Sequence, residues 1–507
     1  MVKSVLEYLE ASEERFPSRC AYEDIQDSYT FSETGQMARA IGSRIGRLKA
    51  PGKPVAVLME KSISMIVAFL GVLYGGCCYC PIDVTMPKER IRSVFSVLEP
   101  EAVIFEEGTK HLSGELDLRC PSFLFQDLIR TETDEELLKK IREQAVDTDA
   151  MYILFTSGST GVPKGVVMNH RVIINNMEWL EQEFSFTEET VMGNQVPLHF
   201  DVANHDIYSP LKFGCRTVLI PAEFFSIPAK LIPFLNERRV TCIFWVPFAL
   251  CVVAEFDALS IQKPKTLRHV FFAGEVMPVK QLNYWRAHIP EAVYVNMYGS
   301  TETHVCTFYR LDREFSDDET LPIGGACGNI SLLVLDEENR PLKPGSEKIG
   351  ELCLRGGGFA AGYYGNTVLT AERFVQNPLN TKFSEQIYRT GDMVSYNDRG
   401  ELLYQNRRDF QVKRLGYRIE LGEIEAAAWD IPGVQRCACL YDSKKKSILF
   451  LYSGTPLERK TLTGCLSRKL PRYMMPARYI YLEQMPLNGN GKIDRRRLME
   501  LYGQKKI

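Results

Sequence analysis

The sequence predicts an α/β protein with three parts: a large N-terminal domain of parallel and mixed sheets covered by helices, a small β subdomain, and a small α+β C-terminal domain. Its 507 residues are too many for one ordinary domain. Apolar, β-rich runs alternate with helical patterns through the first four-fifths of the chain. After Gly350 the pattern changes to short strands and tight turns, which indicates the β subdomain.

The expected strands of the N-terminal domain are continuous apolar runs. They cover 54–60, 101–107, 215–221 and 266–274, and the last is followed by a helical stretch. Strands covered on both faces have this pattern, whereas strands with one wet face alternate apolar and polar residues. Largely parallel, doubly covered sheets are therefore predicted.

The uncharged stretch 65–82, part of the longest run without charged residues, approaches the length of a membrane span. It contains Gly75-Gly76 and Pro81, which favour a buried helix that runs into a strand, and no membrane insertion is expected. Cys77 and Cys80 form a C-x-x-C spacing in this run. Because their surroundings are apolar, packed thiols are expected rather than a redox or metal pair.

A charged turn, 406–411, is expected to end the N-terminal domain, with 1–406 before it and 407–507 after it. The C-terminal part has a helical pattern over 420–430 and strands over 437–442 and 448–453. It closes with a Gly-rich loop, 488–494.

The charge balance and the cysteines narrow the function classes. Lys and Arg number 61 against 64 Asp and Glu, a net charge of −3, so no nucleic-acid partner is expected. The N-terminus has no apolar signal segment, and the 14 cysteines are scattered, which favours a reducing, cytoplasmic location.

The stretch LFTSGSTGVPKG, 154–165, has the small residues and hydroxyls of a phosphate-binding loop and follows an apolar run that predicts a strand. It lacks the Walker pattern, because Lys164 follows Pro163 and no Ser or Thr follows Lys164. Composition alone leaves a flexible surface loop and a phosphate site equally open.

Further motifs in order along the chain resemble those of the adenylate-forming superfamily, specifically the amino-acid adenylation enzymes, which include peptide-synthetase adenylation domains and D-alanine–carrier protein ligases. Besides the loop, these are YGSTET (298–303), GEL (350–352), YRTGD (388–392), RRDFQVK (407–413), GYRIELGEIE (416–425) and NGNGKID (488–494). They cover nearly the whole chain.

The resemblance implies that ATP and Mg²⁺ are the cofactors. Glu302 is implied as the Mg²⁺ ligand, consistent with the preference of this ion for carboxylate oxygens. The residues implied in ATP or AMP binding are Thr156, Ser157, Gly158, Ser159, Thr160, Lys164, Gly274, Glu275, Asn296, Met297, Tyr298, Gly299, Ser300, Thr301, Asp392, Tyr404, Arg407 and Lys492. Among them, Tyr298 would stack on adenine and Asp392 would accept hydrogen bonds from the ribose hydroxyls.

The resemblance makes Lys492 the catalytic cation that bridges the substrate carboxylate and the α-phosphate. Two anions meet in this step, so a positive charge is the expected catalyst. Asp409 would be the hinge of a mobile C-terminal domain, whose rotation withdraws Lys492 and presents the Gly416 loop to a thiol-bearing arm.

Asp201 stands where amino-acid-activating members pair with the α-ammonium, which favours an amino-acid substrate. The full implied substrate set is Asp201, Val202, His205, Phe244, Phe271, Ala273, Met297, Val305 and Cys306. Several are large, so a small or medium amino acid is expected. D-alanine ligases typically have a cysteine at the place of Ala273 and no histidine at that of His205, which places D-alanine in doubt.

The expected reaction is loading of the amino acid, as a thioester, onto a separate phosphopantetheinylated carrier protein, because no carrier-type serine motif is found. The Met1 start favours a native N-terminal end, although excision from a longer synthetase stays open. An acid–CoA ligase that uses free coenzyme A and a non-catalytic nucleotide-binding protein are the alternatives.

Overall fold

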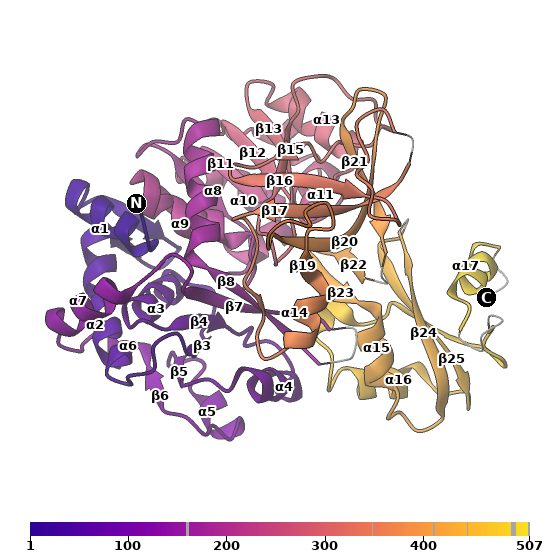
Figure 1. The fold of residues 1–507 in the computed structure, drawn as a ribbon, viewed down its shortest axis with the longest axis horizontal. Coiled ribbons are helices and arrows are strands. Elements are labelled where there is room, and N and C mark those ends of the chain that lie inside the picture. Colours follow the sequence, from indigo (N-terminus) through magenta and orange to yellow (C-terminus); the bar gives the residue numbers. More distant parts are fainter. Residues whose placement is uncertain (159–161, 347, 409–410, 444, 488–492, 505–507) are drawn as a thin grey trace. The chain divides into compact units, whose positions relative to one another are not determined.

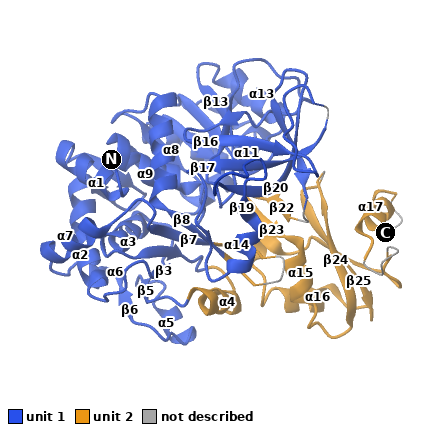
Figure 2. Ribbon diagram, in the orientation of Figure 1, with its two compact units in different colours: residues 1–84, 99–154, 165–408 blue, residues 85–98, 155–164, 409–507 orange. Residues whose placement is uncertain are grey.

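A computed structural model describes residues 1–158, 162–346, 348–408, 411–443, 445–487 and 493–504. Contacts divide the chain into two compact units, coloured separately in Figure 2. Unit 1 contains 1–84, 99–154 and 165–408, and unit 2 contains 85–98, 155–164 and 409–507. The division predicted from the sequence, 1–406 and 407–507, stays a prediction. The two units differ from it because 85–98 and the loop 155–164 group with the C-terminal segment.

The largest sheet of unit 1 is mostly parallel (Figure 1). Antiparallel pairs occur only towards its two ends among the described strands. Its order is β15 (Gly325–Ala326), β14 (Thr307–Arg310), β13 (Val293–Tyr298), β12 (His269–Phe272), β11 (Cys242–Trp245), β9 (Val191–Asn194), β10 (Arg216–Leu219), β1 (Cys20–Glu23) and β2 (Ser28–Thr30).

A second sheet of unit 1 is also parallel through its centre. Its order is β18 (Gly362–Tyr363), β8 (Lys164–Asn169), β7 (Ala150–Thr156), β4 (Cys78–Pro81), β3 (Pro54–Leu58), β5 (Ala102–Phe105) and β6 (Ser122–Leu124). All five residues of β3 are buried, as are all four of β4 and of β5. The predicted strands 54–60 and 101–107 and the expectation of doubly covered parallel sheets are therefore confirmed.

The helices of unit 1 pack on these sheets and on one another; α2 packs against α3 and α7, and α9 against α1 and α8. They are α1 (Leu6–Arg15), α2 (Phe31–Gly46), α3 (Ile63–Tyr74), α5 (His111–Glu115), α6 (Phe125–Leu128), α7 (Glu135–Gln144), α8 (His170–Glu183), α9 (Ala203–Phe213), η1 (Ala222–Ser226), α10 (Pro228–Glu237), α11 (Pro247–Glu255), α12 (Ala258–Ile261), α13 (Val279–His288) and α14 (Thr367–Arg373). The mixed α/β fold class is confirmed.

The uncharged run 65–82 forms most of α3 and all of β4, as predicted. Ser62 caps α3 by accepting a hydrogen bond from the Met65 amide, and Gly76, at φ +74°, lets the chain turn into β4. Within the stretches that the structure describes, every helix is too short or too polar to span a bilayer. Cys77 and Cys80 are buried, which confirms packed thiols.

The β subdomain is an antiparallel sheet and begins earlier than predicted, at Ile330 rather than after Gly350. Its strands are β16 (Ile330–Leu335), β17 (Gly350–Gly356), β20 (Gln386–Tyr396), β19 (Phe374–Gln376) and β21 (Leu402–Arg407). The runs YRTGD and MVSY form one strand, β20. Gly391, at φ +75°, and a register shift make the strand irregular at this point without ending its pairing.

Unit 2 has a sheet with both faces covered. Side chains of β24 and β25 alternate, so Cys439 and Phe450 pack with α15 and α16, whereas Leu440 and Leu449 pack with α17. The elements are α4 (Lys88–Leu98), β22 (Gln411–Arg414), β23 (Tyr417–Glu420), α15 (Leu421–Ala428), β24 (Val434–Asp442), β25 (Ser447–Gly454), α16 (Arg459–Leu466), η2 (Arg472–Met474), β26 (Arg478–Tyr481) and α17 (Arg495–Gly503).

Candidate functional site

The candidate site residues of unit 1 follow the carboxyl ends of neighbouring parallel strands. Strands β9, β11, β12 and β13 are parallel, so their carboxyl ends share one edge of the sheet. Asp201 follows β9, Gly274 follows β12, and Tyr298 ends β13. This edge is where open α/β sheets bind ligands.

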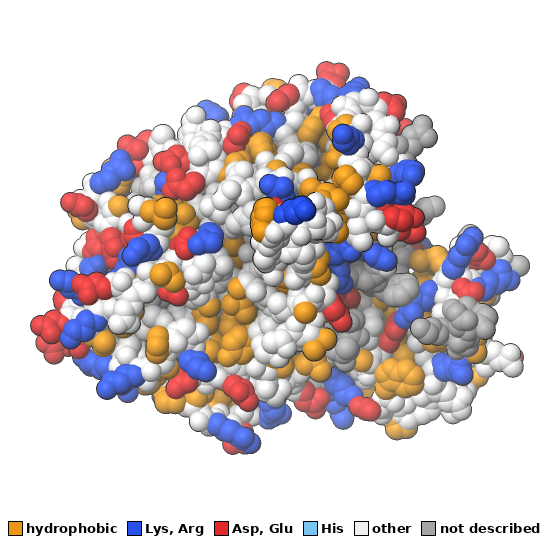
Figure 3. Space-filling view, viewed as in Figure 1, with side chains coloured by type: hydrophobic (Ala, Val, Ile, Leu, Met, Phe, Trp, Pro, Cys, Tyr) orange, Lys and Arg blue, Asp and Glu red, His pale blue; other side chains and the backbone are white. Residues whose placement is uncertain are grey.

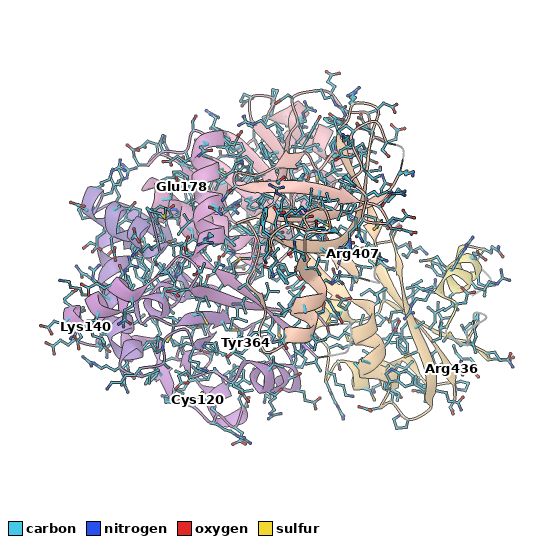
Figure 4. The ribbon with its side chains drawn as sticks, viewed as in Figure 1. Cys120, Lys140, Glu178, Tyr364, Arg407 and Arg436 are labelled. Carbon is cyan, nitrogen blue, oxygen red and sulfur yellow. The ribbon has the colours of Figure 1, made fainter. Side chains whose placement is uncertain are left out.

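A buried polar cluster joins β13 to the β subdomain. The Tyr298 hydroxyl donates to Asp392, which is 2% exposed. Arg407, labelled in Figure 4, donates through Nη1 to Asp392 Oδ1 at 2.8 Å and through Nη2 to the Thr390 carbonyl at 3.0 Å. Burial and the adjacent Asp392 carboxylate raise the pKa of Tyr298 well above its ordinary value, so its proton stays in place.

Chemically, this cluster offers a carboxylate beside two aromatic rings. The Tyr404 ring centroid lies 6.4 Å from that of Tyr298. A carboxylate paired with an arginine can accept hydrogen bonds from a diol, while a tyrosine ring can stack on a planar base. The cluster thus brings together four residues predicted from the sequence: Tyr298, Asp392, Tyr404 and Arg407. Thr390, which was not predicted, accepts a hydrogen bond from the Asp392 amide through Oγ1 at 2.9 Å.

The turn after β13 carries Glu302, which is fully buried and accepts a hydrogen bond from Tyr363 Oη at 2.7 Å. A carboxylate is the kind of oxygen ligand that Mg²⁺ takes, usually alongside phosphate oxygens and water. Among the residues that the structure describes, no group of three or more acidic, His or Cys side chains could hold a metal. Glu302 could supply one carboxylate ligand to Mg²⁺.

Other predicted nucleotide residues lie at the same edge and are held by the backbone. Asn296 donates to the Pro322 carbonyl at 2.8 Å, and Glu275 accepts from the Phe248 amide at 3.2 Å. The Ser300 N–H donates to Thr303 Oγ1 at 3.0 Å.

Gly274 has φ +97°, a conformation that favours glycine. Met297 is buried, and Gly299 and Thr301 are part of the turn.

The predicted substrate residues form a largely apolar set. The carboxylate of Asp201 accepts from the Val202 amide at 3.0 Å. His205, in the first turn of α9, is buried, and its ring centroid lies 4.6 Å from that of Phe244.

Phe271 packs against a different aromatic residue, Phe184, at 4.7 Å between ring centroids. Ala273, Met297, Val305 and Cys306 are buried.

The described part of the phosphate loop belongs to unit 2. Ser157 Oγ donates to the Arg418 carbonyl at 2.9 Å and accepts from the Glu420 amide at 3.0 Å. Lys164 Nζ lies 3.5 Å from Glu420 Oε1, an ion pair between two predicted motifs. Gly158 is required, because a Cβ there would lie 2.0 Å from the Val162 carbonyl oxygen.

Lys492 and Asp409, the predicted hinge residue, lie outside the described residues, as do Ser159 and Thr160. Their roles stay predictions.

A buried ion pair of unit 2, between Arg90 of α4 and Glu423 of α15, was not predicted from the sequence. Burial raises the pKa of Glu423 to about 7, against the opposing effects of Arg90 and the Gly158 amide. Glu423 lies inside one of the motifs, but nothing in the sequence paired it with Arg90.

On the face drawn in Figure 3, basic and acidic side chains of unit 1 are intermixed, which agrees with the near-balanced charge of the chain.

Comparisons with known proteins identify the family. Residues 9–364 match the family described as AMP-binding enzyme. The chain is 32% identical over 499 residues to the L-proline--[L-prolyl-carrier protein] ligase of Streptomyces coelicolor, covering 93% of this chain and 92% of that protein. It is also 32% identical over 478 residues to Tyrocidine synthase 3 of Brevibacillus parabrevis, covering 92% of this chain but only 7% of that much longer protein.

A solved structure gives the same fold. The adenylation domain AlmE of Vibrio cholerae, in complex with glycyl-adenosine-5'-phosphate, superposes with a TM-score of 0.85 and 22% identity, over 99% of this chain and 98% of that one. The predictions of an adenylate-forming family and of an enzyme of the ligase type are confirmed by the sequence matches. The chain therefore belongs to the family of AMP-binding enzymes.

Proposed function

We propose that the chain is an amino-acid–AMP ligase that activates a small or medium amino acid with ATP and then transfers it to the phosphopantetheine thiol of a separate carrier protein. The observation that carries this proposal is the buried cluster of Tyr298, Asp392 and Arg407 at the carboxyl edge of the large sheet. It offers a stacking face and a diol acceptor, the two features that a nucleoside requires.

In the first half-reaction a carboxylate oxygen of the amino acid attacks the α-phosphorus of ATP. A new P–O bond forms, the bond between the α-phosphorus and the bridging oxygen breaks, and pyrophosphate leaves with that electron pair. Asp201 is proposed to bind the α-ammonium, and Lys492 is proposed to supply the positive charge between the two anions. Glu302 would hold Mg²⁺, and this ion would supply positive charge to offset that of the phosphates.

In the second half-reaction the carrier thiolate attacks the acyl carbon of the adenylate. The C–S bond of a thioester forms, the C–O bond to phosphate breaks, and AMP leaves. Asp409 is the proposed hinge for the change between the two half-reactions, and the loop at Gly416 is proposed to guide the thiol-bearing arm.

The test is amino-acid-dependent ATP–pyrophosphate exchange with all proteinogenic amino acids and their D-forms. Exchange with at least one amino acid is expected, and Lys492→Ala should reduce it by about 100-fold or more, the usual effect of removing one transition-state charge contact. Lys164→Ala is the matched lysine control and should reduce exchange less. No exchange with any amino acid would overturn the proposal, and undiminished exchange in Lys492→Ala would overturn the role of that lysine.

The acceptor is tested separately by mass spectrometry of thioester products. Coenzyme A and a phosphopantetheinylated carrier protein serve as competing thiol probes. Acylation of the carrier in preference to coenzyme A is expected. Faster acylation of coenzyme A would overturn the carrier assignment and favour an acid–CoA ligase.

A further inference from the structure

Two buried histidines face each other at the edge of the sheet that carries Asp201. His205, from the first turn of α9, is 2% exposed, and His304, from the turn after β13, is 3% exposed. Their ring centroids are 4.8 Å apart, with the planes at 69°. His304 has φ +52°, in the left-handed region that few residues other than glycine adopt. The fold thus holds His304 in a strained conformation that brings its ring to His205.

Three nitrogens of this pair are buried without a hydrogen-bond partner among the described residues: both ring nitrogens of His205 and Nε2 of His304. Such atoms are rare in native structures, because burial removes water without replacing its hydrogen bonds. Burial, together with the adjacent ring of His304, lowers the pKa of His205. Burial among apolar groups favours the neutral form of an imidazole, which provides one N–H donor and one lone pair.

The surroundings of the pair are apolar. The ring of Phe244 lies 4.6 Å from that of His205, and the buried Val305 and Cys306 directly follow His304. Asp201 precedes His205 by four residues, in the turn that leads into α9. If Asp201 binds the α-ammonium of an amino acid, the unpartnered nitrogens of His205, four residues further on, and of His304 beside it are polar groups that can pair with its side chain.

We infer that His205 and His304 together select an amino acid whose side chain ends in an uncharged hydroxyl or carboxamide. This inference rests on the proposed function and adds His304 as a specificity-determining residue. A hydroxyl or carboxamide both donates and accepts, so it pairs with one N–H and one lone pair of two neutral imidazoles. An apolar side chain leaves all three nitrogens unpaired. A carboxylate brings a charge into a buried set of neutral groups.

The test compares amino acids of equal shape in the unmodified protein. The pairs are threonine with valine, serine with 2-aminobutyrate, and asparagine with leucine. The ratio of kcat/KM in ATP–pyrophosphate exchange should favour the polar member of at least one pair by about 100-fold, because a site built for a hydroxyl strongly rejects the analogue that lacks it. Equal or better exchange with every apolar member, or best exchange with aspartate or glutamate, would overturn the inference.

Variants assign the preference to the two rings. His304→Phe and His205→Phe should each reduce the polar-to-apolar ratio by about tenfold or more, and His304→Gln should restore part of it through its amide. His111→Phe, an exposed histidine at the start of α5, is the control and should leave the ratio unchanged. An unchanged ratio in folded His304→Phe would remove His304 from the assignment. If the unmodified protein shows no ATP–pyrophosphate exchange with any amino acid, the proposed function itself is overturned.

Discussion

Arg407 and Asp392 form an ion pair of 2.8 Å in which both side chains are almost fully buried, at 5% and 3% exposure. Breaking a buried pair by removing one partner is costly, because the other charge stays buried without its partner. The pair also places the carboxylate proposed to bind ribose, so its loss is expected to affect both stability and nucleotide binding.

Arg407→Ala should therefore lower the free energy of unfolding by about 3 kcal/mol and raise the KM for ATP in pyrophosphate exchange by about tenfold or more. Denaturant unfolding and exchange kinetics measure the two effects. Arg408→Ala is the matched control, since the Arg408 side chain is 71% exposed and lies 3.8 Å from Glu351. It should change stability by less than about 1 kcal/mol. Equal effects of the two variants would contradict the importance of the Asp392 pair.

Glu302→Gln should raise the Mg²⁺ concentration that half-saturates exchange by about tenfold, because the variant keeps an acceptor for the Tyr363 hydroxyl but loses the charge that holds the cation. Glu401→Gln is the control, since Glu401 also accepts from a tyrosine, Tyr309 Oη at 2.5 Å, outside the candidate site. If the half-saturating Mg²⁺ concentration rises equally in both variants, or rises in neither, Glu302 is not part of the metal site.

Asp206 gives a prediction for the pH dependence of stability. It is buried in α9 and accepts from Asn194 Nδ2 at 2.8 Å. Burial raises the pKa of its carboxyl from 3.8 to about 7, against the opposing effects of Asn194 and Lys61. A raised pKa means that the folded state holds the proton more tightly than the unfolded chain does. The stability from this group is therefore present below about pH 4 and is lost as the pH rises towards about 7.

Asp206→Asn cannot ionise, so its stability relative to the unmodified protein should increase from about pH 5 to about pH 8, by up to about 3 kcal/mol. Thermal unfolding at several pH values measures the difference. Asp398→Asn, at an exposed turn position, is measured over the same range as the control variant. A difference that falls with rising pH in Asp206→Asn would contradict the sign of the shift.

Gly299→Ala should unfold the turn that carries Glu302 and His304, because a Cβ at 299 would lie 1.5 Å from the His304 carbonyl oxygen. A lower melting temperature and reduced exchange are expected. Gly464→Ala in α16 is the opposite case, since nothing lies within 4 Å of the added Cβ. Alanine has the higher helix propensity, so this variant should be more stable by up to about 1 kcal/mol. A tolerated Gly299→Ala would show that the turn can open without loss.

Much of the fold could be predicted from the sequence because its strands are continuous apolar runs, as in β3, β5 and β12, bounded by glycine or polar residues. The start of the β subdomain at β16 was missed, since ISLLVL has the same composition as a strand of the large sheet. Only the pairing with β17 distinguishes the two, and pairing between distant strands is set by tertiary contacts.

In the candidate site, residues inside the quoted motifs could be predicted, whereas their partners could not. Tyr298 and Asp392 lie in separate motifs, and their hydrogen bond depends on how β13 meets the β subdomain. Tyr363 and Arg90 lie outside every motif and reach their glutamates through the fold alone. His304 directly follows YGSTET, but a histidine at that place has no sequence signal until its neighbour His205 is known.

The cysteines have a chemical consequence under the proposed function. Eleven of the 14 are buried, and burial raises the pKa of Cys77 and of Cys353 to about 12. A thiol needs to ionise before it attacks a mixed anhydride, so these side chains stay unreactive towards an acyl-adenylate. The fold would thereby protect the enzyme from acylating its own cysteines, and the activated amino acid would remain available to an incoming thiol.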